Sequence, residues 1–228
     1  MGKVVKLLVA LLLSPAVFFA LWEMGKLGKN VLGHGQTAFV FLAGAVVYAL
    51  VHYTVYDFSR VYVFMHELTH AFAALLCGCR VKDISVKRES GYVKMDKINT
   101  FVVLAPYFVP GYVLVVTFLY IVGDLFEDLT PYRSVFLFLV GFFMSFHFIQ
   151  TFKTLFEADQ PDLQLAGGKI FSVITITLAN LAVLAVVLKG LFPEQISLTS
   201  AGMSVLKSTL NTWRILVNYI LEHLLKTR

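Results

Sequence analysis

Long runs of apolar residues alternate with short polar segments along the whole chain. A run of about 20 apolar residues is long enough for one helix to cross a bilayer. The pattern therefore predicts an all-α, polytopic membrane protein in which residues 1–228 form a single integral membrane domain. The six predicted transmembrane spans are residues 4–22, 36–56, 59–79, 100–122, 134–155 and 169–191.

Two further segments have different patterns. Residues 81–97 alternate apolar and polar side chains on either side of a turn at residues 89–91. This alternation predicts a short β-hairpin inserted after the third span. Residues 203–226 carry apolar side chains near helical spacing with charged residues between them. They predict a C-terminal amphipathic helix at the membrane surface.

The first apolar run allows a second interpretation. Lys3 and Lys6 precede it, and a basic start followed by an apolar run is also typical of a secretory signal peptide. No small-x-small cleavage site directly follows Trp22, which favours a retained helix.

Composition excludes several classes of protein. Hydrophobic residues make up 58% of the chain and charged residues 14%, whereas soluble domains carry about 25% charge. The chain is therefore neither a soluble enzyme nor a disordered protein. Its 19 basic and 14 acidic residues give a net charge of +5, but the basic residues lie between apolar runs and form no nucleic-acid-binding motif. We expect the lipid bilayer, and no nucleic acid, as a partner.

The charges also predict which loops share a side of the membrane. Residues 80–99 are basic and residues 123–133 are acidic, which places the former in the cytoplasm and the latter outside. With three spans before the hairpin, Lys3 and Lys6 would then lie outside, against the same rule. Either the first segment does not cross, or the stronger basic loop decides the orientation. We expect a multi-pass protein of a prokaryotic cell membrane.

The third predicted span contains the sequence His66-Glu67-Leu68-Thr69-His70. On a helix, His66 and His70 lie on one face and can bind one Zn²⁺, while Glu67 can act as the general base. A carboxylate at bilayer depth costs about 2.5–3.5 kcal/mol and tends to mark a functional site. The alternative is a polar cluster that joins helices by hydrogen bonds.

A catalytic zinc ion has three protein ligands and an open position. The number of spans puts residues 156–168 on the side of the hairpin, and this segment offers Glu157, Asp159 and Asp162. His147 is a further candidate, since it lies at a similar depth to His70. It could bind zinc, stabilise an oxyanion, or form a hydrogen bond to a neighbouring helix.

These residues resemble the site-2 protease family of intramembrane zinc metalloproteases. The likeness covers residues 61–188. It rests on the H-E-L-T-H sequence in an apolar helix, on the Cys-Gly-Cys-Arg-Val sequence at 77–81 that leads into a hairpin with Gly-Tyr-Val at 91–93, and on a later acidic turn before an apolar helix.

The resemblance also bears on the third ligand, which in that family is an Asp, usually within an Asp-Gly-Gly motif. Here Gly167 and Gly168 match the glycines, but Ala166 occupies the position of the Asp. We therefore predict Asp162, one helical turn earlier, as the third ligand. Asp159 is the next candidate, and Glu157 would suit the zinc proteases that use a Glu.

The resemblance implies a zinc metalloendopeptidase that cleaves membrane-protein or peptide substrates in or near the bilayer. It implies that residues 81–97 pair with an unwound substrate segment. Pro106 and Pro110 would kink the fourth span, either at a substrate gate or for packing alone. The competing hypothesis, motivated by Ala166, is a non-proteolytic zinc-binding membrane protein: a sensor, a transporter or an inactive protease-like scaffold. Glu67 argues against it, because such a protein needs no general base.

Overall fold

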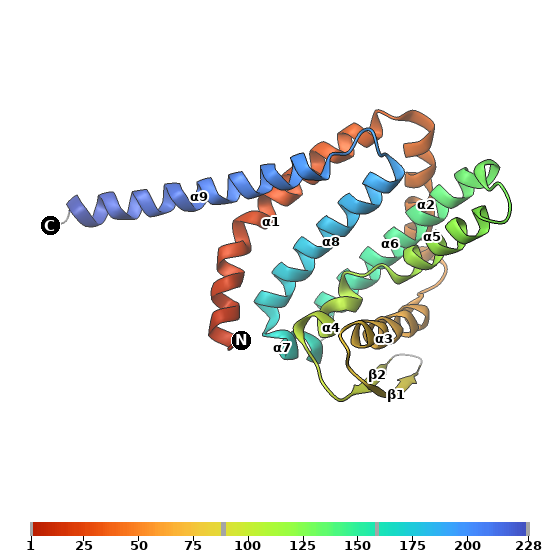
Figure 1. Cartoon of the computed structure of the whole chain (residues 1–228), viewed down its shortest axis with the longest axis horizontal. Helices are drawn as coiled ribbons and strands as arrows, with labels where there is room; N and C mark the ends of the chain where they lie inside the picture. Colours follow the sequence, from red (N-terminus) through yellow and green to blue (C-terminus); the bar gives the residue numbers. More distant parts are fainter. Residues whose placement is uncertain (1, 88–89, 158–159, 227–228) are drawn as a thin grey trace.

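The computed structural model describes residues 2–87, 90–157 and 160–226, and most of them are helical (Figure 1). A small hairpin is inserted among the helices. The elements in chain order are α1 (Lys3–Leu32), α2 (Gly35–Thr54), α3 (Ser59–Leu76), β1 (Val81–Val86), β2 (Gly91–Met95), α4 (Thr100–Leu104), the 3₁₀ turn η1 (Ala105–Tyr107), α5 (Gly111–Asp124), the 3₁₀ turn η2 (Thr130–Tyr132), α6 (Arg133–Glu157), α7 (Pro161–Ala166), α8 (Lys169–Leu191) and α9 (Leu198–Lys226).

Four helical segments among the described residues are long and apolar enough to cross a membrane: α1, α2, the segment Thr130–Phe156 that contains α6, and α8. A possible fifth span is the pair of helices Thr100–Tyr107 and Gly111–Asp124. The chain bends by 78° between them. Pro110 lies at this break, where its ring and missing N–H prevent a continuous helix. The chain therefore has four or five candidate spans, and the prediction of six is not confirmed.

The predicted and observed numbers of spans differ mainly because of α3. This helix corresponds to the predicted span 59–79 and is not among the candidate spans. Arg60 and the polar residues of the histidine motif lower its hydropathy. The predicted spans 4–22 and 100–122 also change. The first is part of the 30-residue helix α1, and the second is the bent pair.

The predicted hairpin is confirmed as a pair of antiparallel strands, β1 and β2. Ile84 pairs with Val93 and Ser85 with Tyr92, and the register shifts between Val81 and Asp83. Residues 88 and 89, which include part of the predicted turn, lie outside the described residues. In the structure Gly91 is the first residue of β2.

Two glycines allow α2 and α6 to pack backbone to backbone. A Cβ atom at Gly44 would lie 2.0 Å from the carbonyl oxygen of Phe138, and one at Gly141 would lie 1.9 Å from that of Phe41. Small residues commonly permit such close helix contacts in membranes. The main apolar core forms around this contact and includes Phe41, Leu137, Val140, Met144, Leu188 and Phe192.

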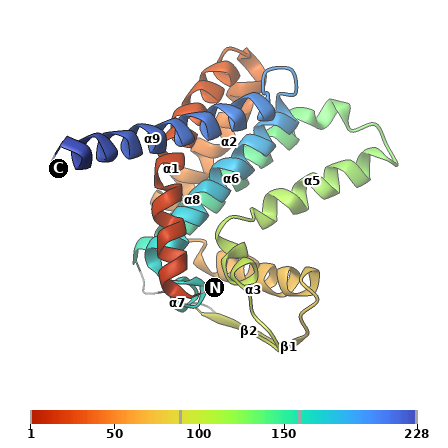
Figure 2. The same cartoon turned by 60° about the vertical axis from the view of Figure 1, so that its left-hand side comes forward.

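The start of α1 lies at the same end of the molecule as α3, α7 and the hairpin (Figure 2). Lys6 Nζ donates hydrogen bonds to Thr100 Oγ1 and to the carbonyl oxygen of Ala166, so this end of α1 is in contact with α4 and α7. Only two candidate spans, α1 and α2, precede the hairpin. Lys6 and the basic hairpin can therefore share one side, and the conflict with the positive-inside rule disappears.

Helix α9 begins at Leu198, before the predicted start at residue 203, and its C-terminal part extends away from the other helices (Figure 1). It contacts α1 through Trp213 Nε1, which donates a hydrogen bond of 3.0 Å to the carbonyl oxygen of Leu12. Its location at the membrane surface stays a prediction.

Candidate metal centre

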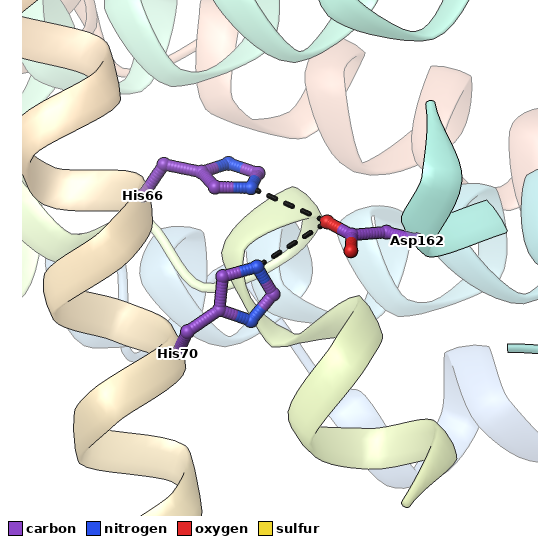
Figure 3. A group of neighbouring side chains, drawn as sticks. All are labelled: His66, His70 and Asp162. Carbon is purple, nitrogen blue, oxygen red and sulfur yellow. Dashed lines mark hydrogen bonds and ion pairs between the residues drawn. The ribbon is translucent and has the colours of Figure 1, made fainter. Parts of the chain in front are cut away.

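Helix α3 presents His66 and His70 on one face, one helical turn apart. Figure 3 shows both imidazole rings pointing from α3 toward Asp162. Asp162 is the second residue of α7, directly after Pro161. Proline is favoured in the first helical turn, and an acidic residue there is stabilised by the free backbone N–H groups.

The distances in this group suit a metal ion. Asp162 Oδ2 lies 3.6 Å from His66 Nε2 and 3.3 Å from His70 Nε2. One ligand atom from each of the three residues lies within 4.8 Å of the others. Two imidazole nitrogens and one carboxylate oxygen are a donor set typical of a catalytic zinc ion with an open position.

The far side of each imidazole ring is also in contact with an oxygen. His70 Nδ1 donates a hydrogen bond of 2.9 Å to the carbonyl oxygen of Val102, and His66 Nδ1 lies 3.3 Å from the hydroxyl of Tyr62. The carbonyl contact fixes the His70 ring with its Nε2 free for the metal, and the Tyr62 contact holds the His66 ring in place. The residues present therefore fit zinc in their orientation as well as in their type.

Asp162 is held by a side chain from the bent segment. The buried Tyr107 hydroxyl donates a hydrogen bond of 3.1 Å to Asp162 Oδ2, and its ring packs edge-on against His66 with centroids 5.0 Å apart. Burial would raise the pKa of the Asp162 carboxyl, but its contacts with His66 and His70 outweigh burial and lower that pKa. An ionised carboxylate is the form that binds a metal ion.

Glu67 lies beside the histidines and is only 6% exposed. Its carboxylate makes no hydrogen bond or ion pair with any other described residue. The first residue of β2 covers it, because a Cβ atom at Gly91 would lie 2.4 Å from Glu67 Cγ. A buried carboxylate without a partner is costly, which is typical of a residue retained for chemistry.

Glu67 and the three other residues line one cavity of about 640 Å³. This volume lies within the range of ordinary ligand pockets. Helix α3 and strand β2 line it together with polar side chains from α6. The lining includes Ser59, Tyr62, Gly91, Tyr92, Val93, Gln150, Lys153, Thr154 and Gln160.

Of the other predicted candidates, the structure describes the side chain of His147, which is not part of this group. His147 Nε2 donates a hydrogen bond of 3.0 Å to Asn180 Oδ1, so this side chain joins α6 to α8, the third of the alternatives considered for it. Asp159 lies outside the described residues, as does the side chain of Glu157. Ala166 is the last residue of α7 and is fully buried in an apolar cluster.

Sequence reasoning missed Tyr107, Val102 and Tyr62. Tyr62 could have been found, because it lies four residues before His66 and hence on the same helical face. Tyr107 was harder to find from the sequence, because its only distinguishing feature is a hydroxyl group between Pro106 and Pro110. Val102 gave no signal, since it acts through its backbone.

Comparison with known proteins agrees with this geometry. The family model described as Peptidase M50B-like matches residues 39–156, which is just over half of the chain and includes the whole histidine motif. No curated protein and no solved structure matches the chain. The chain therefore belongs to the Peptidase M50B-like family, as its resemblance to the site-2 proteases predicts.

Proposed function

We propose that this protein is an intramembrane zinc metalloprotease that hydrolyses peptide bonds of membrane-embedded substrates. One observation carries the proposal: His66, His70 and Asp162 converge in a cavity that Glu67 also lines. The family supports a membrane metalloprotease, and the apolar helices support a multi-pass protein. We expect the membrane to be that of a prokaryotic cell.

His66, His70 and Asp162 would hold the zinc ion. A zinc ion bound there supplies a Lewis acid that polarises a carbonyl group and makes a water molecule more acidic. Glu67 would act as the general base, taking a proton from the attacking water on its carboxylate and giving it to the leaving amine. Gly91 lies directly against the Glu67 side chain and limits where it can move.

Strand β2 gives the cavity a wall that suits an extended peptide. β2 pairs with β1 along one edge, and its other edge pairs with no strand among the described residues. A free strand edge can bind an extended segment through its backbone groups. A substrate helix must unwind before its peptide bonds can be attacked, so we infer that β2 holds the unwound segment beside Glu67.

The proposal is tested with the full chain reconstituted in liposomes and supplied with single-pass transmembrane peptides. We expect about one zinc ion per native chain. Glu67→Gln should keep the zinc and lower cleavage by about 10²- to 10⁴-fold, because it removes only the base. Asp162→Ala should lose the zinc, whereas Asp159→Ala, the same change at the next candidate in the sequence, should retain it.

Two results would contradict the proposal. A native chain that folds but binds no zinc would favour an inactive scaffold. A chain that binds zinc but cleaves no peptide of the panel, or whose cleavage is unaffected by Glu67→Gln, would favour a non-proteolytic zinc protein or another base.

A further inference from the structure

Lys6 makes contacts unlike those of a lysine that only marks the end of a membrane helix. Its Nζ atom donates hydrogen bonds of 3.1 Å to Thr100 Oγ1 and 2.6 Å to the carbonyl oxygen of Ala166. It also lies 5.6 Å from the ring centroid of Phe171, a distance at which a cation is attracted to an aromatic face. No carboxylate among the described residues forms an ion pair with it.

The two hydrogen bonds join the two short helices that serve the metal centre. Thr100 is the first residue of α4, the helix whose Val102 carbonyl orients His70. Ala166 is the last residue of α7, the helix that carries Asp162. Lys6 thus contacts the helix behind one proposed ligand and the helix bearing another.

The chain leaves room for this lysine at Gly167. A Cβ atom there would lie 2.2 Å from Lys6 Cδ, and the backbone has φ +136°, a conformation that favours glycine. Gly167 therefore ends α7 and also lets the lysine stem pass over it. A basic side chain that binds the last carbonyl of a helix stabilises that end.

We propose that Lys6 is a positioning residue of the metal centre, which fixes α4 against α7 so that His70 and Asp162 face each other. The proposal rests on the proposed function, since it assumes that these residues bind zinc. It also makes the first helix part of the site, although most of that helix is far from the chemistry.

The test measures the affinity of the full chain in detergent for Zn²⁺ by competition with a chelator. The absorption spectrum of bound Co²⁺ reports the geometry of the site. Lys6→Met keeps the length of the stem but removes the donor, and should weaken zinc binding about tenfold, as changes behind a ligand commonly do. Lys6→Arg should restore most of the affinity. Lys3→Met, which changes an exposed lysine of the same helix, should alter neither readout.

Thr100→Val removes the hydrogen bond between Lys6 and Thr100 from the other side. It should weaken zinc binding less than Lys6→Met does, and the double variant should be no weaker than Lys6→Met alone, because both changes break one contact. This variant also serves as the test if Lys6→Met fails to fold.

Each outcome decides between the proposals. If the native chain binds zinc and Lys6→Met binds it equally well, Lys6 has no positioning role and the proposed function stands. The proposed role of Lys6 is wrong if Lys6→Arg binds zinc as weakly as Lys6→Met does. It is also wrong if the losses of zinc affinity caused by Thr100→Val and Lys6→Met add fully. If the native chain binds no zinc, both proposals fall.

Discussion

The Tyr107 hydroxyl donates its hydrogen bond to the oxygen of Asp162 that also faces both histidines. Asn180 of α8 secures the backbone at the same residue, since its amide donates a hydrogen bond of 2.8 Å to the Tyr107 carbonyl oxygen. The bend in the chain after η1 therefore presents a fixed hydroxyl to the proposed third ligand.

Tyr107→Phe should lower the affinity for zinc by about tenfold while the fold is kept, because it removes one hydrogen bond behind a ligand. Chelator competition in detergent measures the change. Tyr120→Phe is the control, since the Tyr120 hydroxyl, near the end of α5, donates a hydrogen bond to the carbonyl oxygen of Leu129 and to no side chain of the site. Equal affinities of Tyr107→Phe and the native chain would show that Asp162 does not need this contact.

Gly91→Ala should impair catalysis more than metal binding. The added methyl group would lie 2.7 Å from Glu67 Oε1 as well as against Cγ, and the flexible glutamate side chain can move more easily than the strand. A displacement of a reacting group by about 1 Å can cost 10²-fold in rate. Cleavage should fall by about that factor with zinc content unchanged. Lys87→Ala, an exposed change in the same hairpin, should cleave normally.

Gly141→Ala should destabilise the protein, because neither backbone at the α2–α6 contact can move without separating the helices. Overpacking of this kind costs about 1–3 kcal/mol or more. Gly190→Ala in α8 meets no atom within 4 Å and should be neutral or stabilise by about 0.4–1 kcal/mol. Thermal unfolding in detergent compares the two variants. A Gly141→Ala protein as stable as the native one would contradict the packing described for α2 and α6.

Asp57, in the loop between α2 and α3, predicts a pH dependence of stability. Partial burial opposes its ionisation, but hydrogen bonds from Lys153 and Ser59 outweigh this and lower its pKa to about 2. Because the folded-state pKa is lower than the unfolded one, Asp57 stabilises the protein above the unfolded pKa, and this contribution is lost as the pH falls toward 2.

Asp57→Asn should therefore lower the unfolding temperature at neutral pH by a small amount, since the Asp57 side chain is half exposed to solvent. The difference from the native chain should shrink as the pH falls below about 4. A difference that stays constant over this range would show that the charge of Asp57 plays no part.

The sequence predicted the chemistry of the candidate site better than its surroundings. His66, Glu67 and His70 follow from local spacing alone, because a helix fixes the relation between residues four apart. Asp162 needed both the count of spans, which offered three carboxylates, and the resemblance to the site-2 proteases, and the structure brings it to the histidines. Tyr107 contacts Asp162, and Lys6 contacts the helices behind the site, both from segments far away in the sequence, and no periodicity marks such contacts.

The number of spans was harder to predict for a related reason. The apolar run at residues 59–79 has the length of a span, but its polar residues lower its hydropathy, and α3 is not among the candidate spans. Pro106 and Pro110 were recognised as a kink, although the size of the bend depends on packing against α3 and α6. The length of an apolar run alone does not distinguish a helix that crosses the membrane from a helix that carries site residues.

The proposed third ligand lies on α7, a six-residue helix between α6 and α8, and α3 is not among the candidate spans either. The proposed metal ligands therefore lie on helices outside the candidate spans, and we expect them near the boundary of the bilayer, where water reaches them without entering the hydrocarbon. A substrate helix would meet them close to one of its ends, where several backbone groups already lack partners within the helix. Cutting at such a frayed end requires fewer hydrogen bonds to be broken than cutting at the midpoint.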